Sequence, residues 1–139
     1  SVVAGQGACT NSGFADQFEL GGCYAPIADF DLLMAAVDSA RELGVSMPVG
    51  NLYSSDTFYD DALSLSDWQK MGVLAVEMES AALYMNAARL SKNALAMFTI
   101  SDNLMNGQSL SVEERQEGFD DMIKLSLETA RLYNIGGGV

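Results

Sequence analysis

Two acidic motifs in this sequence contain residue types that can carry out acid–base chemistry. Glu77-Met78-Glu79 follows an apolar segment at 73–76, and Ser101-Asp102 follows a second apolar segment at 94–100. We expect both segments to be strands of an open α/β sheet, in which ligands bind beyond the carboxyl ends of the strands. The carboxyl groups of the two motifs are therefore candidates for one site.

Each carboxylate also has a structural interpretation. Glu79 could stabilise the positive end of the helix that follows it. Asp102 could form a turn in which its side chain caps nearby backbone amides. For either residue alone the structural interpretation is at least as good as the functional one. The occurrence of both motifs at one sheet edge favours a site.

Arg115 lies where a cation is unfavourable in a helix. We expect it in the first turn of the last helix, at the positive end of the helix dipole. The other arginines lie near the carboxyl ends of expected helices, where cations are normal. Arg115 therefore needs an acidic partner. The candidates are Glu113 or Glu114 in an ordinary ion pair, and Asp102 in a functional one.

The composition excludes several classes of function. The chain has 7 Lys and Arg residues against 19 Asp and Glu residues, and a net charge of −12. We expect no nucleic-acid partner and no membrane partner, because a nucleic acid or an anionic membrane requires a basic face. The chain has no histidine. Zinc sites built on imidazole and Ser-His or Cys-His catalysis are thus excluded within it.

The same sequence indicates where the protein resides. No apolar run approaches the roughly 20 residues that a membrane span requires. The first residues lack the basic start of a signal peptide. We therefore expect a cytoplasmic protein in which Cys9 and Cys23 are reduced thiols. Both cysteines are expected to be buried as small hydrophobic residues.

Apolar segments with strand character alternate with helical patterns, which predicts an α/β fold with a mainly parallel sheet. The expected strands are at 1–8, 46–53, 73–76 and 94–100. The expected helices are at 29–44, 65–71 and 80–92, followed by one that begins after Ser111 with a capping box to Glu114.

Apolar stripes on two of these helices predict their buried faces. The first stripe consists of Phe30, Leu33, Met34, Val37 and Ala40. The stripe of the last helix consists of Phe119, Met122, Ile123 and Ala130.

Two further features are weaker candidates for a site. Gly5-x-Gly7 lacks the third glycine of a dinucleotide fingerprint, so we interpret it as a packing feature. Phe58 could be an exposed core residue or a stacking platform for a flat ligand.

Four segments resemble signature regions of the nucleoside phosphorylase superfamily. They are Val76–Tyr84 (VEMESAALY), Thr99–Asp102 (TISD), Glu113–Gln116 (EERQ) and Ala28–Asp31 (ADFD). Within the superfamily, the sequence is most similar to the bacterial hexameric purine-nucleoside phosphorylases, from about Val2 to Tyr133. The resemblance implies a mainly parallel mixed sheet flanked by helices.

The resemblance covers only the C-terminal part of such a protein. It implies that residues 1–135 are the C-terminal part of a single phosphorylase domain and that 136–139 are a flexible tail. The N-terminal portion, which carries the family's main phosphate ligands, has no counterpart here. We expect this chain to require that N-terminal portion as a partner. We also expect the protein to form a homo-oligomer, a hexamer arranged as three dimers.

The implied activity is that of a glycosyltransferase, more specifically a pentosyltransferase. It is the reversible phosphorolysis of purine (deoxy)ribonucleosides to a free base and (deoxy)ribose 1-phosphate. Inorganic phosphate is the co-substrate, and no cofactor or metal is implied.

The resemblance also implies a role for each matching residue. Asp102 would protonate N7 of the purine, Arg115 would promote that transfer, and Glu79 would bind the ribose hydroxyls above Met78. Phe58, Val76 and Glu77 would line the base pocket, and Ser101 would lie beside Asp102. Because an aspartate has an ordinary pKa of about 3.9, we expect the pocket of the complete enzyme to raise the pKa of Asp102 until Arg115 closes on it.

Two alternatives remain. A nucleosidase of the same superfamily, of the methylthioadenosine/adenosylhomocysteine hydrolase type, also has a Glu-Met-Glu motif and a Ser-Asp pair. The Glu-Glu-Arg-Gln context of Arg115 favours the phosphorylase. The other alternative is an inactive fragment that acts only in assembly.

Overall fold

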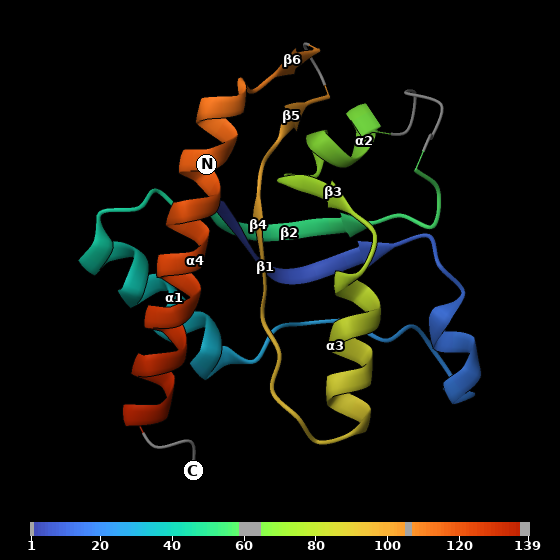
Figure 1. Cartoon of the computed structure of the whole chain (residues 1–139). Helices are drawn as coiled ribbons and strands as arrows, with labels where there is room; N and C mark the ends of the chain where they lie inside the picture. The colour runs from blue at the N-terminus through green and yellow to red at the C-terminus, as the bar shows by residue number, and fades with distance from the viewer. Residues whose placement is uncertain (1, 59–64, 105–106, 137–139) are drawn as a thin grey trace. The chain divides into compact units, whose positions relative to one another are not determined.

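The computed structural model describes residues 2–58, 65–104 and 107–136 (Figure 1). By its internal contacts the chain divides into two units. Unit 1 comprises residues 1–4, 29–48 and 97–139, and unit 2 comprises residues 5–28 and 49–96.

Strands and helices alternate along the chain, which confirms the predicted α/β class. The strands are β1 (Val2–Thr10), β2 (Val49–Ser54), β3 (Ala75–Glu77), β4 (Ala96–Thr99), β5 (Asp102–Asn103) and β6 (Gln108–Ser109). The helices are α1 (Phe30–Leu43), α2 (Leu65–Lys70), α3 (Ser80–Arg89) and α4 (Val112–Ile135), with a 3₁₀ turn η1 at Phe14–Phe18. The η1 turn and the β5–β6 hairpin are the elements that the sequence did not predict.

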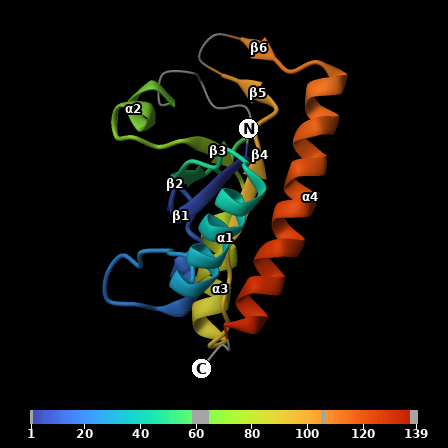
Figure 2. The ribbon, with the colours of Figure 1, turned by 90° about the vertical axis from the view of Figure 1, so that its left-hand side faces the viewer.

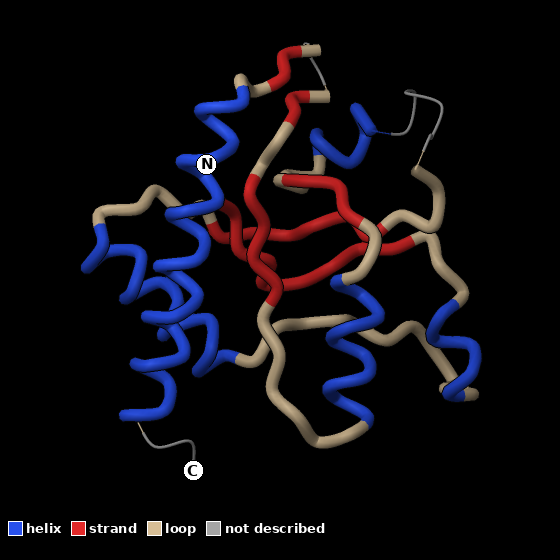
Figure 3. The backbone as a smooth tube through the Cα atoms, in the orientation of Figure 1, coloured by secondary structure: helices blue, strands red, loops and turns tan. Residues whose placement is uncertain are grey.

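One sheet has the strand order β3-β2-β1-β4, and β5 and β6 form a separate antiparallel pair. In unit 2, β2 and β3 run parallel, so that Ser54 lies opposite Glu77 at the carboxyl ends of both strands. This register brings a hydroxyl and a carboxyl group to the same sheet edge. Figure 3 shows that β3 then leads through a short turn into α3.

In unit 1, α1 and α4 pack side by side (Figures 1 and 2). Helix α1 begins as predicted, because the Asp29 carboxylate accepts a hydrogen bond of 2.9 Å from the Leu32 amide. It ends at Gly44, whose φ of 67° favours glycine. The core of this unit consists of Val2, Ala40 and Leu125, with Val45, Met47, Met97 and Met122 packed against it.

The predicted apolar stripes of α1 and α4 are wrong in part. The buried residues of α1 are Ala36, Ser39 and Ala40, and those of α4 are Gly118, Leu125 and Thr129. Large members of the predicted stripes, namely Phe30, Met34, Phe119 and Ile123, are instead 39–70% exposed. Small residues occupy the contact faces because they allow close packing. A Cβ on Gly118, for example, would lie 2.9 Å from the Thr99 methyl carbon.

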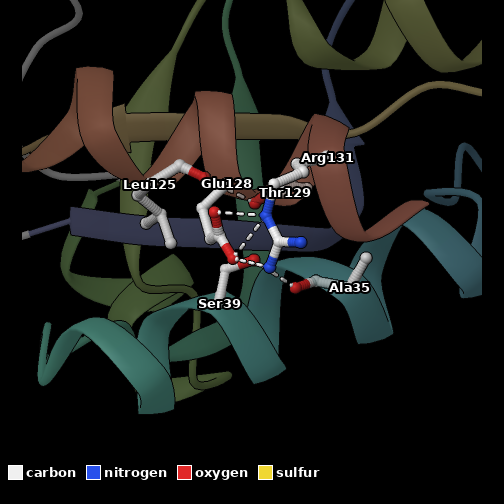
Figure 4. A network of polar contacts seen from close by, with 6 residues as sticks. All are labelled: Ala35, Ser39, Leu125, Glu128, Thr129 and Arg131. Carbon is white, nitrogen blue, oxygen red and sulfur yellow. Dashed lines mark hydrogen bonds and ion pairs between the residues drawn. The ribbon is translucent and has the colours of Figure 1, made fainter. Parts of the chain in front are cut away.

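Two hydroxyl groups are buried in this helix pair, and both are satisfied within their own helix. Ser39 donates to the Ala35 carbonyl at 2.7 Å, and Thr129 donates to the Leu125 carbonyl at 2.7 Å (Figure 4). Burial of these hydroxyls therefore leaves no unpaired donor. On the exposed side, Arg131 pairs with Glu128 one turn earlier, and this contact lowers the pKa of Glu128.

In unit 2, Tyr84 of α3 bridges two strands. Its hydroxyl donates to the Gly5 carbonyl at 2.5 Å and accepts from the Ala96 amide at 3.0 Å. Burial raises the pKa of this phenol. Gly5 is a packing position, as predicted, because a Cβ there would lie 2.4 Å from the Leu52 Cδ1 atom.

The segment between β1 and α1 contains η1. It borders a pocket of about 300 Å³ that is lined by Phe18, Leu20, Tyr24, Met85, Ala88 and Arg89. Cys9 is half-buried and Cys23 is exposed. The expectation that both cysteines are buried is wrong for Cys23, because this segment follows the surface of the unit instead of entering its core. Within the described ranges, no helix is long and apolar enough to cross a membrane.

Candidate active site

Asp102 and Arg115 are brought together in unit 1. Asp102 begins β5 and lies opposite Ser109 in the β5–β6 hairpin. Its Oδ2 atom accepts a hydrogen bond from the Ser101 hydroxyl at 2.8 Å, and its Oδ1 atom lies 3.4 Å from Nη2 of Arg115. Both charged side chains are 43% exposed. A carboxyl group is thus held among hydroxyl donors and a cation, at a position that solvent reaches.

The start of α4 directs Arg115 to this partner. Ser111 accepts from the Glu114 amide at 3.1 Å, and the Glu114 carboxylate accepts from the Ser111 amide at 2.8 Å. This is the predicted capping box, and it lowers the pKa of Glu114. The cap thus engages the carboxylate of Glu114, one of the two alternative partners of Arg115. The guanidinium contacts Asp102 instead.

The pKa of Asp102 is lowered in this structure. The Ser101 hydroxyl makes the largest contribution, followed by the Ser109 hydroxyl, and the Arg115 charge adds to them. Each of these groups stabilises the carboxylate, and an exposed carboxyl group experiences little of the desolvation that raises a pKa. In this structure Arg115 lies against Asp102, and Asp102 is an anion at neutral pH. The expectation of a raised pKa before that contact forms stays a prediction.

Arg115 retains hydrogen-bonding capacity beyond this pair. Its Nε atom is buried and has no hydrogen-bond partner among the described residues. A guanidinium has five N–H donors in a fixed plane, and the contact to Asp102 uses one nitrogen. The side chain could therefore bind a second acceptor without releasing Asp102.

The Glu77-Met78-Glu79 motif lies in unit 2, where β3 ends and α3 begins. Val76 and Met78 are 38% and 41% exposed, so both can contact a ligand. Glu79 is exposed and occupies the N-cap position of α3, but its side chain makes no capping hydrogen bond. Its carboxylate accepts a hydrogen bond of 3.2 Å from the Met78 amide. The carboxylate otherwise faces solvent, where it is accessible to a ligand.

Glu77 and Ser54 supply the cap that Glu79 does not. The Oε2 atom of Glu77 accepts from the amides of Glu79 and Ser80, each at 2.7 Å. Its Oε1 atom accepts from the Ser54 hydroxyl, which in turn accepts from the Ala81 amide at 2.9 Å. The predicted role of Glu77 in a base pocket stays a prediction. Its carboxylate is engaged by groups of this chain.

Phe58 follows β2 and is 76% exposed. A ring that is this exposed can serve as a stacking surface. The residues at 59–64, which follow it, lie outside the described residues. The predicted tail at 136–139 also lies outside them, apart from Gly136.

Sequence reasoning missed Ser54 and Ser109. Each contacts a predicted site carboxylate from the paired strand: Ser54 reaches Glu77 across 23 residues of sequence, and Ser109 reaches Asp102 across the β5–β6 hairpin. For Ser54, the feature of the sequence that could have indicated a site residue is its position directly after a predicted strand. Ser109 had no signal, because the hairpin that places it was not predicted.

The chain matches a known family over nearly its whole length. The family model described as the phosphorylase superfamily matches residues 2–131. The chain belongs to the phosphorylase superfamily. This membership confirms the resemblance on which the site residues were assigned.

Curated relatives of this chain are named as phosphorylases. The purine nucleoside phosphorylase DeoD-type of Listeria welshimeri is 45% identical over 129 residues, which are 93% of this chain and 55% of that protein. The protein of the same name from Caldanaerobacter subterraneus is 52% identical over 108 residues, which are 77% of this chain and 47% of that protein. A third, from a Geobacillus species, is 42% identical over 129 residues. The chain spans about half the length of the curated relatives it matches.

Proposed function

We propose that the protein of which this chain forms part is a purine-nucleoside phosphorylase. It cleaves purine (deoxy)ribonucleosides with inorganic phosphate and releases the base and (deoxy)ribose 1-phosphate. The observation that carries the proposal is the Asp102–Arg115 pair at the capped start of α4. The pair supplies an acid for the leaving base, in a chain whose relatives are named for this reaction.

In this mechanism Asp102 is the general acid. It gives its proton to N7 of the purine as the glycosidic bond breaks, and Arg115 stabilises the carboxylate that remains. The lowered pKa of Asp102 fits the second half of this step, because the ion pair has the charge distribution expected after proton transfer. The protonated form must therefore arise with substrate bound, when the base excludes water from the carboxyl group.

The other residues bind the substrate. Glu79 hydrogen-bonds the ribose hydroxyls, with Met78 beneath the sugar. Phe58 and Val76 line the base pocket, and Ser101 holds the acid. The exposure of Glu79, Met78 and Phe58 supports these roles, since each side chain is accessible to a ligand.

Phosphate acts as the nucleophile, so the reaction needs no covalent enzyme intermediate and no cofactor. A phosphate dianion needs clustered donors or cations. Among the arginines of the described segments, Arg115 alone lies at the amino end of a helix, and it is paired with Asp102. We therefore assign the main phosphate ligands to the part of the relatives that lies outside the match. We also propose a homo-oligomer, a hexamer of three dimers, as the functional assembly.

A hybrid chain tests the proposal. In it, this chain replaces the matching region of the Listeria welshimeri phosphorylase. We expect the hybrid chain to release hypoxanthine from inosine at a rate that depends on phosphate. Release at the same rate without phosphate would instead indicate a nucleosidase. No release by a folded hybrid chain would contradict the proposed function.

A further inference from the structure

The amino terminus of α3 is capped by side chains from two strands. The first amides of a helix have no partner within the helix, and normally the N-cap side chain accepts from one of them. In α3 the N-cap residue is Glu79, which makes no such bond. Instead, Glu77 of β3 accepts from the amides of Glu79 and Ser80, and Ser54 of β2 accepts from the amide of Ala81.

The two capping side chains also hold each other. Ser54 and Glu77 are opposite in the β2–β3 register, and the Ser54 hydroxyl donates to the Glu77 carboxylate. The next amide, that of Ser55, donates to the Glu77 carbonyl at 2.8 Å. Ser54 is 4% exposed, so water does not compete for its hydroxyl. The bonds of this hydroxyl therefore have more effect than a surface bond.

The network surrounds the residue that is proposed to bind ribose. One carboxylate oxygen of Glu77, Oε2, accepts hydrogen bonds from the backbone amides of both Glu79 and the next residue, Ser80. The Glu79 side chain contacts the amide of its own neighbour, Met78. Its direction is thus determined by the backbone at 78–80. That backbone is held by Glu77 and, through Glu77 and Ala81, by Ser54.

We propose that Glu77, together with Ser54, is a positioning residue that orients Glu79 toward the nucleoside sugar. This inference rests on the proposed function for the identity of the ligand, because it assigns the sugar to Glu79. It differs from the base-pocket role of Glu77, which would bring the carboxylate itself against the purine. Both carboxylate oxygens accept from groups of this chain, which favours the positioning role.

Amide hydrogen exchange in the 139-residue chain tests the cap without any activity. In Glu77→Ala, we expect the amides of Glu79 and Ser80 to exchange about tenfold faster, as for the loss of one hydrogen bond. Glu77→Gln retains an oxygen at the same reach and should restore most of the protection. In Ser54→Ala the amide of Ala81 should lose protection. Unchanged exchange at 79–80 in Glu77→Ala would overturn the proposal.

Kinetics of the hybrid chain separate positioning from base contact. If Glu77 acts through Glu79, Glu77→Ala raises KM for inosine and adenosine by the same factor. Glu79→Ala then adds little in the Glu77→Ala background, because the two changes remove one function. Glu77→Gln recovers most of the affinity. A change in the ratio of the KM for inosine to the KM for adenosine in Glu77→Gln would instead show that Glu77 contacts the base. This result would overturn the positioning role.

Asp29→Ala is the matched control. It removes the cap of α1, a side-chain acceptor of the same kind, which binds the Leu32 amide within unit 1. It should leave KM unchanged. If it raises KM as Glu77→Ala does, general destabilisation explains the effect and the proposal fails. If the wild-type hybrid chain folds but has no activity, the proposed function fails. The exchange experiment then still decides whether Glu77 holds the backbone of Glu79.

Discussion

Asp102 can donate a proton only to a substrate that needs one. Asn at this position keeps the shape and can hydrogen-bond N7, but it cannot release a proton at neutral pH. In the hybrid chain, Asp102→Asn should slow inosine phosphorolysis by on the order of 10²–10⁴, the usual contribution of general acid catalysis. In a nucleoside with a cationic base, such as 7-methylguanosine, the base leaves without protonation. The rate of its phosphorolysis should therefore change little.

Steady-state kinetics with both substrates measure this discrimination. Arg115→Ala should show the same pattern more weakly, because Arg115 acts on the carboxylate and not on the base. Glu79→Ala should affect every substrate alike, through the sugar. Equal slowing of inosine and 7-methylguanosine by Asp102→Asn would show that Asp102 positions the substrate and is not the acid.

The lowered pKa of Asp102 has a defined origin that titration can check. Because the Ser101 hydroxyl contributes most, Ser101→Ala should raise the pKa of Asp102 more than Arg115→Ala does. A carboxyl group whose pKa is lower in the folded state stabilises the fold above its unfolded pKa of about 3.9. That stabilisation is lost as the pH falls through the lowered value. Carbon-13 NMR of the Asp102 carboxyl group measures this pKa in both variants. A larger rise in Arg115→Ala than in Ser101→Ala would contradict this assignment.

Helix α3 is attached to its neighbouring strands by the hydroxyl of Tyr84. Tyr84→Phe leaves the Gly5 carbonyl and the Ala96 amide buried without this partner. An unsatisfied buried polar group costs about 1–3 kcal/mol, so we expect the free energy of unfolding to fall by about that amount. Urea denaturation measures it. Tyr24→Phe, at a 39% exposed position, is the control and should change little. Equal stability of Tyr84→Phe and wild type would show that the bridge contributes nothing.

Large apolar side chains remain exposed on α4, and they affect the behaviour of the whole molecule. Phe119, Ile123 and Leu127 are spaced by four residues and are 51–69% exposed, so they form one stripe. Exposed apolar stripes of this kind favour association. We expect the 139-residue chain to self-associate, and Ile123→Gln with Leu127→Gln to reduce the associated fraction in light scattering. Lys124→Gln is the control. A monodisperse wild-type monomer with a cooperative thermal transition would contradict this prediction.

The 139-residue chain by itself should have negligible phosphorolysis activity. It matches 55% of the Listeria welshimeri protein, and its described residues offer no cluster of arginines for a phosphate dianion. Arg115 is already paired with Asp102. A phosphate-dependent release of hypoxanthine from inosine by this chain alone would contradict the prediction and would reveal a phosphate site within these residues.

The sequence by itself determined the fold class, the order of the main strands and helices, and the need of Arg115 for an acidic partner. These follow from local rules. Asp29 and Ser111 mark helix starts because their side chains reach amides within three residues. Apolar segments of strand length alternate with helices, which is sufficient to predict an α/β sheet. Arg115 needs an acidic partner because a cation is unfavourable at the amino end of a helix, and this is a property of its own helix alone.

Only the tertiary structure decided which helix faces are buried and which side chains support the candidate site. In the α1–α4 pair, Ala36, Ser39 and Thr129 are buried in place of larger apolar residues, because close contact between helices selects small volume and a hydrophobicity pattern does not record volume. Ser54 reaches Glu77 through the β2–β3 register, across 23 residues of sequence. A register is a property of two strands together, so neither segment alone predicts it. For the same reason the sequence did not predict that the Ser109 hydroxyl, across a hairpin, lowers the pKa of Asp102.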